Sequence, residues 1–237
     1  MRALLLAAGL GTRLKPITEQ VPKCMVSLAG RPLLGHWFEH LLSTQQGQPP
    51  IIDRILVNLH HMPDIVTNYI KKSEWIDHID TVFEDKLLGT CGTLRNNIDY
   101  FDDAPFFLAH ADNASRFGLD QFLGKFLIRP VDCIGTMMTF YTENPSSCGI
   151  VKVNGDDVLS AYYEKQLNPP GSQANAAIFI FDHRIRSVLD ECPDATDLCG
   201  EIVPRLIGQL NIFHNDVYHR DIGTPQSYQQ AVKDYSQ

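Results

Sequence analysis

The strongest constraint on the fold is the N-terminal apolar run Leu4–Ala8, which leads directly into Gly9 and Gly11. A short, continuous run of small and branched apolar residues is typical of a strand that is buried on both faces. Two cations, Arg13 and Lys23, follow the glycines. A buried strand that ends in such a turn presents backbone N–H groups and positive charge at one point, and both stabilise a phosphate group.

The spacing of this turn disfavours the two commonest nucleotide-binding turns. It reads G-x-G-x-x-L, because Leu14 stands where a dinucleotide-binding fingerprint has its third glycine. It also lacks the G-K-[ST] ending of a P-loop. Taken alone, the turn is equally consistent with a phosphate site and with a strand-to-loop connection that binds nothing.

Composition narrows the function classes. The chain has 237 residues, of which 44% are hydrophobic, enough for one large α/β domain. A net charge of -8 argues against nucleic-acid binding but not against a nucleotide, which needs only a local cluster of cations. The six cysteines form no C-x-x-C pair, which predicts reduced thiols. Without a signal-peptide pattern or a long apolar stretch, we expect a cytoplasmic protein with no membrane partner.

Strands and helices alternate through the first half of the chain. We expect strands at 2–7, 51–59, 79–83 and 105–109, and helices at 32–42 and 64–72, the first of them broken by the stretch 47–50. The stretch 8–31 is predicted as a long functional loop. Residues 87–94 are predicted as a second glycine-bearing loop that runs into a short helix. This alternation indicates a parallel, doubly wound sheet.

The pattern changes in the second half, where short strand-like runs are separated by polar turns. We expect strands at 133–140, 149–153, 158–163, 175–181, 211–213 and 216–219, and helices near 119–128, 183–190, 200–208 and 225–235. These runs predict an antiparallel or mixed lobe. No linker separates an independent domain, so a single domain over 1–237 is expected.

Four features fall at the carboxyl ends of predicted strands, where ligands bind in open α/β sheets. They are the turn Gly9–Arg13, the loop Gly89–Thr93, Asp112 and Asp221. Each aspartate alone could be an ordinary turn or helix-start residue. Together with Lys23 and the glycine turn, they form the set needed to hold a nucleoside triphosphate with Mg²⁺, which takes only one or two protein carboxylates.

A second group of polar residues lies in the lobe. Glu164 and Lys165 end one strand, and Asn175 begins another. The first two could be an ordinary exposed pair. In the functional interpretation, Lys165 meets a second phosphate, while Glu164 and Asn175 hydrogen-bond hydroxyl groups. The neighbouring Tyr162 and Tyr163 are left without an assignment.

Taken in order, these motifs resemble those of the sugar-1-phosphate nucleotidylyltransferases, in a short, single-domain, mannose-1-phosphate guanylyltransferase-like form. The matching residues are L-A-A-G-L-G-T-R with Pro22-Lys23, L-G-T-C-G-T-L, Asp112, Gly149-Ile150-Val151, Glu164-Lys165, Asn175 and D-I-G-T-P from Asp221. The resemblance implies a Rossmann-like, glycosyltransferase-A-type α/β fold with a doubly wound mixed sheet and a small β-rich sugar-binding lobe. Residues 1–130 would form the nucleotide-binding half, and 131–237 the sugar-phosphate-binding half with the closing helices.

The resemblance also implies roles for individual residues. The triphosphate would be bound by Leu6, Ala7, Ala8, Gly9, Gly11, Thr12 and Arg13, and the base by Gly89, Thr90 and Gly92. Lys23 would approach the α-phosphate, and Asp112 and Asp221 would ligate Mg²⁺. These two aspartates, Arg13 and Lys23 are therefore the expected catalytic residues. The sugar would be held by Gly149, Glu164 and Asn175, and its phosphate by Lys165.

The reaction implied is attack by a sugar-1-phosphate on the α-phosphorus of a nucleoside triphosphate, which gives a nucleotide sugar and pyrophosphate. The motif sequences K-C-M and L-G-T-C-G-T-L favour GTP over UTP or dTTP as the nucleotide donor. Two alternatives stay open: a cytidylyltransferase that acts on a non-sugar phosphate such as phosphocholine, and a catalytically idle regulator that binds nucleotide sugars. A homodimer is the default expectation.

The sequence departs from the family pattern at four positions. Cys24 stands where proline is frequent, and Ala111 stands where glycine usually precedes the metal-binding aspartate. Gln166 replaces a proline after the Glu-Lys pair, and Ala177 replaces a glycine. The last two changes bear on the identity of the sugar more than on the chemistry.

Overall fold

The computed structural model describes residues 1–44 and 49–236, so the predicted break at 47–50 lies partly outside the described residues. The chain forms two compact units. The first unit comprises Met1–Leu87, Ala109–Arg116 and Tyr218–Gln237, and the second unit comprises Leu88–Leu108 and Phe117–Val217. This interleaving differs from the predicted division at residue 130, because the chain passes between the units several times. That all of 1–237 acts as one domain stays a prediction.

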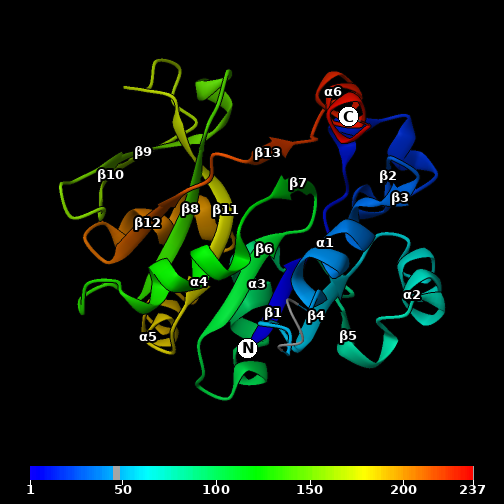
Figure 1. Cartoon of the computed structure of the whole chain (residues 1–237), viewed down its shortest axis with the longest axis horizontal. Helices are drawn as coiled ribbons and strands as arrows, with labels where there is room; N and C mark the ends of the chain where they lie inside the picture. Colours follow the sequence, from blue (N-terminus) through cyan, green and yellow to red (C-terminus); the bar gives the residue numbers. More distant parts are fainter. Residues whose placement is uncertain (45–48, 237) are drawn as a thin grey trace. The chain divides into compact units, whose positions relative to one another are not determined.

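The first unit contains the predicted parallel strands. These are β1 (Arg2–Leu6), β4 (Arg54–Leu59) and β5 (Ile79–Phe83), which pair in the order β1-β4-β5. Helix α1 (Leu33–Leu42) buries its apolar face as predicted, and α2 (Pro63–Lys72) packs on β5 (Figure 1). The apolar run is buried from Ala3 to Ala8, so the buried segment continues past the end of β1 up to the glycine turn.

The stretch 8–31 is more ordered than the predicted loop. It contains three short turns of 3₁₀ helix, η1 (Thr12–Leu14), η2 (Ile17–Glu19) and η3 (Lys23–Met25), and the small antiparallel pair β2 (Ser27–Leu28) and β3 (Arg31–Pro32). The last 3₁₀ turn forms because the Pro22 carbonyl accepts a hydrogen bond from the Met25 N–H at 2.8 Å. The turn places Lys23 at a defined position.

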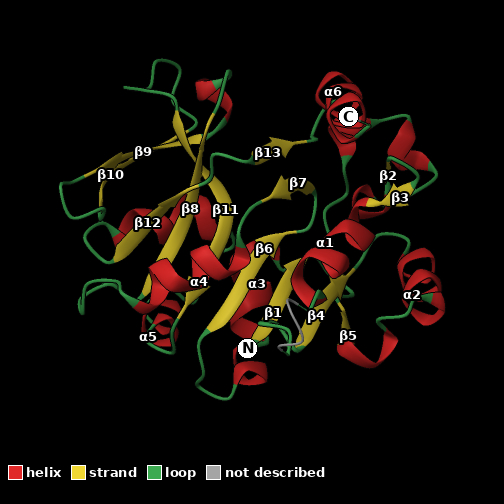
Figure 2. Cartoon of the chain, viewed as in Figure 1, coloured by secondary structure: helices red, strands yellow, loops and turns green. Residues whose placement is uncertain are grey.

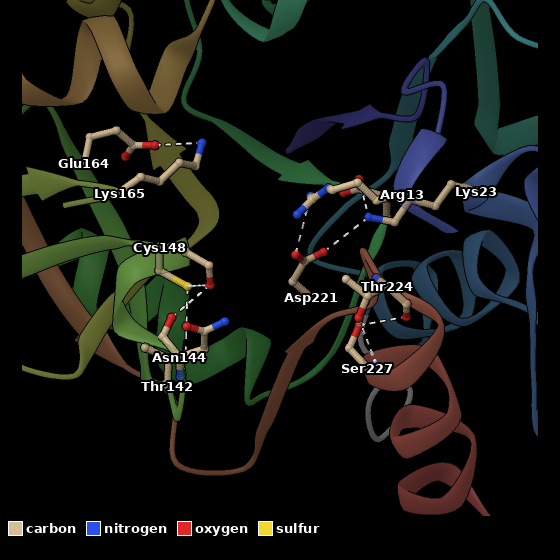
Figure 3. A network of polar contacts seen from close by, with 12 residues as sticks. Arg13, Lys23, Thr142, Asn144, Cys148, Glu164, Lys165, Asp221, Thr224 and Ser227 are labelled. Carbon is tan, nitrogen blue, oxygen red and sulfur yellow. Dashed lines mark hydrogen bonds and ion pairs between the residues drawn. The ribbon is translucent and has the colours of Figure 1, made fainter. Parts of the chain in front are cut away.

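A pair of short strands completes the first unit; one of them overlaps the strand expected at 216–219, and the other was not expected from the sequence. Strand β6 (Phe106–His110) starts in the second unit and ends in the first, and β7 (Asn113–Arg116) follows it. Strand β7 pairs antiparallel with β13 (Tyr218–Asp221). The final helix α6 (Pro225–Tyr235) begins at a capping box, in which Thr224 and Ser227 bond each other's backbone N–H (Figure 3).

The second unit contains a mixed sheet, as predicted for this half. Its strands are β8 (Gly135–Tyr141), β9 (Gly149–Val153), β10 (Leu159–Glu164), β11 (Gln173–Phe181) and β12 (Leu210–His214). Strands β12 and β8 are parallel, and the other pairs, β8–β11, β11–β9 and β9–β10, are antiparallel (Figure 2). Helix α4 (Leu119–Leu127) packs on β8 and β12.

Two helix predictions in the second unit need correction. Gly89 and Gly92 lie inside helix α3 (Gly89–Asn96), not in a loop before it. The helix expected near 200–208 is instead a π-helical turn, η7 (Leu198–Ile202), followed by a 3₁₀ turn, η8 (Val203–Leu206). Pro204 has no N–H to donate, which works against a regular α-helix there. Helix α5 (Ile185–Asp190) matches its prediction.

The remaining 3₁₀ turns are η4 (Ile76–His78), η5 (Ile98–Phe101) and η6 (Pro145–Ser147). Among residues 1–44 and 49–236, no helix has the length and apolar character needed to span a bilayer.

Candidate functional site

The exit from β1 is fixed by buried polar side chains. Leu6 pairs with Asn58 across the β1–β4 ladder, and the next residue, Ala7, donates its N–H to Asn58 Oδ1 at 2.7 Å. Asn58 in turn donates to Glu84 Oε1 at 3.0 Å in the buried interior. Because buried amides of this kind must be hydrogen-bonded, the direction in which the chain leaves β1 is set before the glycine turn begins.

The turn itself requires glycine at position 11. Gly11 has φ +63°, and a Cβ there would lie 2.8 Å from a methyl carbon of Thr18 and 3.1 Å from Cβ of Lys23. The Gly11 carbonyl accepts hydrogen bonds from the Thr18 hydroxyl at 2.8 Å and from the Leu14 N–H at 2.9 Å. Glycine thus permits both the left-handed backbone and its close approach to Lys23.

A cavity of about 310 Å³ opens at this turn. Within residues 1–44 and 49–236, the backbone N–H groups of Gly9, Leu10 and Gly11 have no acceptor. The cavity is lined by Leu10, Gly11, Thr12, Arg13, Lys23, Leu87, Asp112 and Gly223, all in the first unit. The lining thus includes backbone donor groups and two cations, Arg13 and Lys23, which suit an anion.

The two predicted aspartates meet at the ammonium of Lys23. Lys23 Nζ lies 2.8 Å from Asp112 Oδ2. The same nitrogen lies 3.2 Å from Asp221 Oδ1 (Figure 3). The pairing of β7 with β13 brings the aspartates together, because it aligns Asp221 with Asn113, the residue after Asp112. The Lys23 side chain is only 6% exposed, so its charge is compensated mainly by these two carboxylates.

Burial and the neighbouring charges shift the pKa values of Lys23 and Asp112 in opposite directions. Burial alone would lower the pKa of Lys23, but the carboxylates of Asp112 and Asp221 outweigh it, and the pKa lies above its ordinary value. Burial would likewise raise the pKa of Asp112, but the Lys23 ammonium, with a contribution from His110, holds it below its ordinary value. The pair is therefore ionised at neutral pH.

Arg13 is the more accessible cation. Its guanidinium Nη2 lies 4.0 Å from Asp221 Oδ2, and its side chain is 69% exposed. A Cβ at Gly223 would lie 3.0 Å from that nitrogen and 2.9 Å from Asp221 Oδ2, so the glycine lets the two side chains approach. The structure thus brings the predicted residues Arg13, Lys23, Asp112 and Asp221 together in the first unit.

The donor set fits a small divalent cation. Asp112 and Asp221 direct hard oxygen atoms at one position, which Lys23 Nζ shares in this structure. In the part of the chain that the structure describes, no group of three or more His, Cys, Asp and Glu residues is arranged to hold a metal. Mg²⁺ usually takes only one or two protein carboxylates and keeps water or phosphate for the rest, so two aspartates suffice for it.

Two departures from the family pattern fit this geometry. Cys24 is buried, and burial raises the pKa of its thiol to about 12, so it acts as a small neutral side chain beside the cation. Ala111 is fully buried and donates its N–H to the Leu6 carbonyl at 3.0 Å. Ala111 does not have a positive φ, so its position does not require glycine.

The residues predicted to hold the sugar gather in the second unit. Lys165 Nζ lies 2.9 Å from Glu164 Oε1 (Figure 3). Asn175 Nδ2 lies 3.3 Å both from the Tyr162 hydroxyl and from Cys199 Sγ. The Tyr162 hydroxyl donates to Glu164 Oε2 at 2.8 Å. Tyr162 had no assignment from the sequence, and Cys199 was not among the residues expected in this group.

Gly149 belongs to the same group for a steric reason. It pairs with Glu164 across the β9–β10 ladder. A Cβ at this position would overlap the Tyr162 hydroxyl and lie 2.7 Å from Glu164 Oε2. The absence of a side chain at Gly149 therefore makes room for the Tyr162–Glu164 hydrogen bond.

Gly89 and Thr90 pack against the segment 196–199. Gly89 has φ +72°, and a Cβ there would overlap the Thr196 carbonyl. The Thr90 hydroxyl accepts from the Leu198 N–H at 2.8 Å and donates to Asp197 Oδ1 at 3.5 Å. A Cβ at Gly92, on the next turn of α3, would meet only the Leu88 side chain, at 3.1 Å. The predicted contact of Gly89, Thr90 and Gly92 with a base stays a prediction.

A buried parallel strand, a glycine turn and paired carboxylates around a lysine define an α/β protein with a site for anions and cations at the end of its first strand. The chain belongs to the nucleotidyl transferase family, whose model matches residues 2–237. This result confirms the family-level resemblance seen in the sequence.

The curated proteins that this chain resembles carry a more specific name than the family. The chain is 29% identical over 236 residues to the mannose-1-phosphate guanyltransferases of Emericella nidulans and Aspergillus oryzae, and 28% identical over 237 residues to that of Schizosaccharomyces pombe. Each match covers 96% of this chain, and the chain spans 62% of the length of these relatives.

Solved structures confirm the predicted α/β fold. HddC from Yersinia pseudotuberculosis matches with a TM-score of 0.80 and 23% identity, over 99% of both chains. The same protein complexed with GMP-PN matches with a TM-score of 0.77. A putative glucose-1-phosphate thymidylyltransferase from Bacillus anthracis matches with a TM-score of 0.80 and 18% identity, over 99% of this chain and 95% of that one.

Proposed function

We propose that this chain is a sugar-1-phosphate nucleotidyltransferase, which transfers a nucleotidyl group from a nucleoside triphosphate to a sugar-1-phosphate and releases pyrophosphate. The observation that carries the proposal is the convergence of Asp112 and Asp221 on Lys23, beside the turn Gly9–Arg13. Membership of the nucleotidyl transferase family and the names of the curated relatives support it.

The proposed chemistry needs no general base, because the attacking phosphate is already ionised near neutral pH. The barrier comes from repulsion between two anions and from charge that builds on the departing pyrophosphate. Positioning and electrostatic stabilisation are the means by which protein groups lower such a barrier. Lys23 would stabilise the α-phosphoryl oxygens, and Arg13 with the N–H groups of Gly9 and Gly11 would bind the leaving group.

The acceptor would be held by residues of the second unit. Glu164 would offer carboxylate oxygens to hydroxyl groups, and the exposed ammonium of Lys165 would pair with a phosphate. Asp112 and Asp221 would hold Mg²⁺, which when bound supplies positive charge to the phosphate oxygens.

The identities of the nucleotide base and of the sugar phosphate are part of the proposal. We favour GTP as the donor and mannose- or heptose-1-phosphate as the acceptor. This choice is based on the sequences of the motifs and on the names of the curated relatives. UTP and dTTP are the next donors to test. A homodimer and a cytoplasmic setting stay predictions.

A pyrophosphate-release screen with Mg²⁺ tests the proposal. GTP, UTP, dTTP and CTP are each combined with mannose-1-phosphate, heptose-1-phosphate, glucose-1-phosphate and phosphocholine. Release with GTP and one of the sugar phosphates is the expected result. Release with CTP and phosphocholine alone would support the cytidylyltransferase. Binding of nucleotide sugars without any release would identify an idle regulator.

Matched variants locate the activity. Asp112→Asn and Asp221→Asn should each lower turnover by a factor on the order of 10² to 10³, the usual loss when a preorganised charge is removed. Asp80→Asn is the control, because Asp80 forms an exposed ion pair with Arg54 on β4 and β5. Near-normal turnover in either site variant would contradict the metal-ligand assignment.

A further inference from the structure

The hydroxyl of Tyr162 lies between two of the residues proposed to hold the acceptor. It is 2.8 Å from Glu164 Oε2 and 3.3 Å from Asn175 Nδ2. Burial raises the pKa of this phenol far above its ordinary value, so the hydroxyl keeps its proton. A phenol can donate one hydrogen bond and still accept another. Tyr162 therefore links the two side chains.

The backbone N–H of Ala177 determines which way the hydrogen bonds between Asn175, Tyr162 and Glu164 run. Asn175 Oδ1 accepts a hydrogen bond from the Ala177 N–H at 2.8 Å, and a backbone N–H can only donate. The other end of the amide, Nδ2, must then face Tyr162 and Cys199, to which it donates. Because Asn175 donates to the Tyr162 oxygen, the Tyr162 proton is directed at Glu164.

The link ends on a carboxylate that can only accept further hydrogen bonds. Glu164 Oε2 accepts from Tyr162, and Glu164 Oε1 is paired with Lys165. An ionised carboxylate has about four acceptor positions, so each oxygen keeps one for a ligand. A ligand that matches this arrangement offers hydroxyl donors to Glu164 and an anionic group to Lys165.

We propose that Tyr162 is a positioning residue for the acceptor: its hydroxyl holds the Glu164 carboxylate as a hydrogen-bond acceptor for the hydroxyl groups of a sugar phosphate. This inference rests on the proposed function, and it narrows the acceptor to a polyol phosphate. Phosphocholine has no hydroxyl donor for these oxygens. Gly149 serves the same arrangement, because any side chain there would displace the Tyr162 hydroxyl.

The test is a direct binding titration, which does not depend on turnover. Wild type and Tyr162→Phe are titrated with mannose-1-phosphate, with phosphocholine and with inorganic phosphate. We expect the variant to bind mannose-1-phosphate about ten-fold more weakly or worse, the usual size of a lost hydrogen bond to a charged group. Binding of inorganic phosphate, which can use Lys165 or the cations at the glycine turn but offers no sugar hydroxyl to Glu164, should be unchanged.

Tyr163→Phe is the matched control. Tyr163 is the next residue on β10, and successive side chains of a strand point to opposite faces. It should bind all three ligands as wild type does. Equal binding of mannose-1-phosphate by wild type and Tyr162→Phe would overturn the inference, as would equal weakening toward inorganic phosphate.

A double-mutant cycle separates positioning from a structural role. If Tyr162 acts through Glu164, Tyr162→Phe should add less than about a two-fold loss in a Glu164→Gln background. Full additivity of the two losses would overturn the inference. Should Tyr162→Phe not fold, Glu164→Gln alone remains decisive, because unchanged affinity for mannose-1-phosphate would show that this carboxylate accepts nothing from the sugar.

The proposed function and the inference fail in different ways. Absence of pyrophosphate release by a wild-type protein that binds mannose-1-phosphate counts against the reaction alone. Stronger binding of phosphocholine than of mannose-1-phosphate by wild type counts against the inference, since a polyol phosphate is then not the preferred ligand.

Discussion

Lys23 and Asp112 form an ion pair of 2.8 Å although they lie 89 residues apart in the sequence. The same ammonium reaches Asp221, which is 198 residues away. The 3₁₀ turn after Pro22 presents the lysine, and the β7–β13 pair presents both carboxylates. The site therefore depends on three segments that are held by the first unit alone.

The first prediction concerns Lys23→Met, which keeps an unbranched side chain one atom shorter than lysine but removes its charge. Asp112 and Asp221 would then keep only the exposed Arg13 guanidinium, 4.0 Å from Asp221, as a neighbouring cation of the site, so the free energy of unfolding at pH 7 should fall by about 1–3 kcal/mol. Turnover should fall by a factor on the order of 10² to 10³. Urea denaturation and the pyrophosphate assay measure the two effects.

Added Mg²⁺ distinguishes the variant from wild type. The ion should raise the thermal midpoint of Lys23→Met more than that of wild type, because the carboxylates have lost their internal cation. Lys15→Met is the control, since Lys15 forms an exposed pair with Glu19, and it should change stability by less than about 0.5 kcal/mol. An unfolding curve of Lys23→Met that matches wild type would contradict the role given to this ion pair.

The second prediction concerns acid stability and Asp182. This carboxylate is buried at the end of β11 and accepts hydrogen bonds from Arg129 at 2.5 Å and from Arg184 at 2.8 Å. Burial alone would raise the pKa of Asp182, but the hydrogen bonds from Arg184 and Arg129 outweigh it, and the pKa lies below its ordinary 3.8. The folded state therefore binds the proton less tightly than the unfolded chain does.

The sign of the pH effect follows from this pKa. The stabilisation is complete well above pH 4 and is lost as the pH falls through the lowered pKa. Asp182→Asn should cost about 3 kcal/mol at pH 7, and the cost should shrink as the pH falls from 5 to 3. Asp99→Asn, at an exposed partner of Arg186, is the control for urea titrations at each pH. A cost for Asp182→Asn that is independent of pH would show that its charge is not involved.

The third prediction concerns Gly149→Ala. A methyl group at this position would overlap the Tyr162 hydroxyl, so the hydrogen bond to Glu164 should break. We expect a loss of affinity for mannose-1-phosphate similar to that of Tyr162→Phe, about ten-fold, with inorganic phosphate unaffected. Gly155→Ala is the control, because a Cβ there would meet no atom within 4 Å. Unchanged affinity in Gly149→Ala would show that the hydroxyl can be accommodated elsewhere.

The elements that could be predicted are those with a local signal. The buried runs of β1 and β6, and the spacing of Trp37, Phe38 and Leu41 in α1, are readable because burial of a strand or helix imposes its own period. Asp112 and Asp221 could be identified because ligand sites gather at strand ends. Their meeting could not be derived, because β7 is short, polar and pairs with a strand about 100 residues further on.

Tyr162 shows the same limit in the second unit. Its alternation with Glu164 along β10 predicts that the two share a face of the sheet. Its other partner comes from another strand, because Asn175 lies on β11. Cys199, to which Asn175 donates, lies in η7, a π-helical turn that overlaps the start of the helix expected near 200–208. Side-chain partners that meet through distant segments leave no pattern in either segment alone.

Ala177 has φ 54°, in the left-handed region that favours glycine. It follows Asn175 at an irregularity in the β8–β11 register, and Asn175 Oδ1 accepts its N–H at 2.8 Å. The sequence comparison with the family had already singled out this position, where glycine is usual. The structure gives the physical reason, since an alanine in this conformation costs about 1–2 kcal/mol.

The last prediction compares Ala177→Gly with Ala174→Gly on the same strand. Both residues are buried, so each substitution loses about 0.8 kcal/mol of methyl burial and about 0.4–1 kcal/mol through the more flexible unfolded chain. Ala174 has no positive φ, and its substitution should destabilise the protein by about 1–2 kcal/mol. At Ala177 the relief of backbone strain offsets this loss, and the free energy of unfolding should change by less than about 0.5 kcal/mol. Equal losses in the two variants, measured by urea denaturation, would show that Ala177 is not strained.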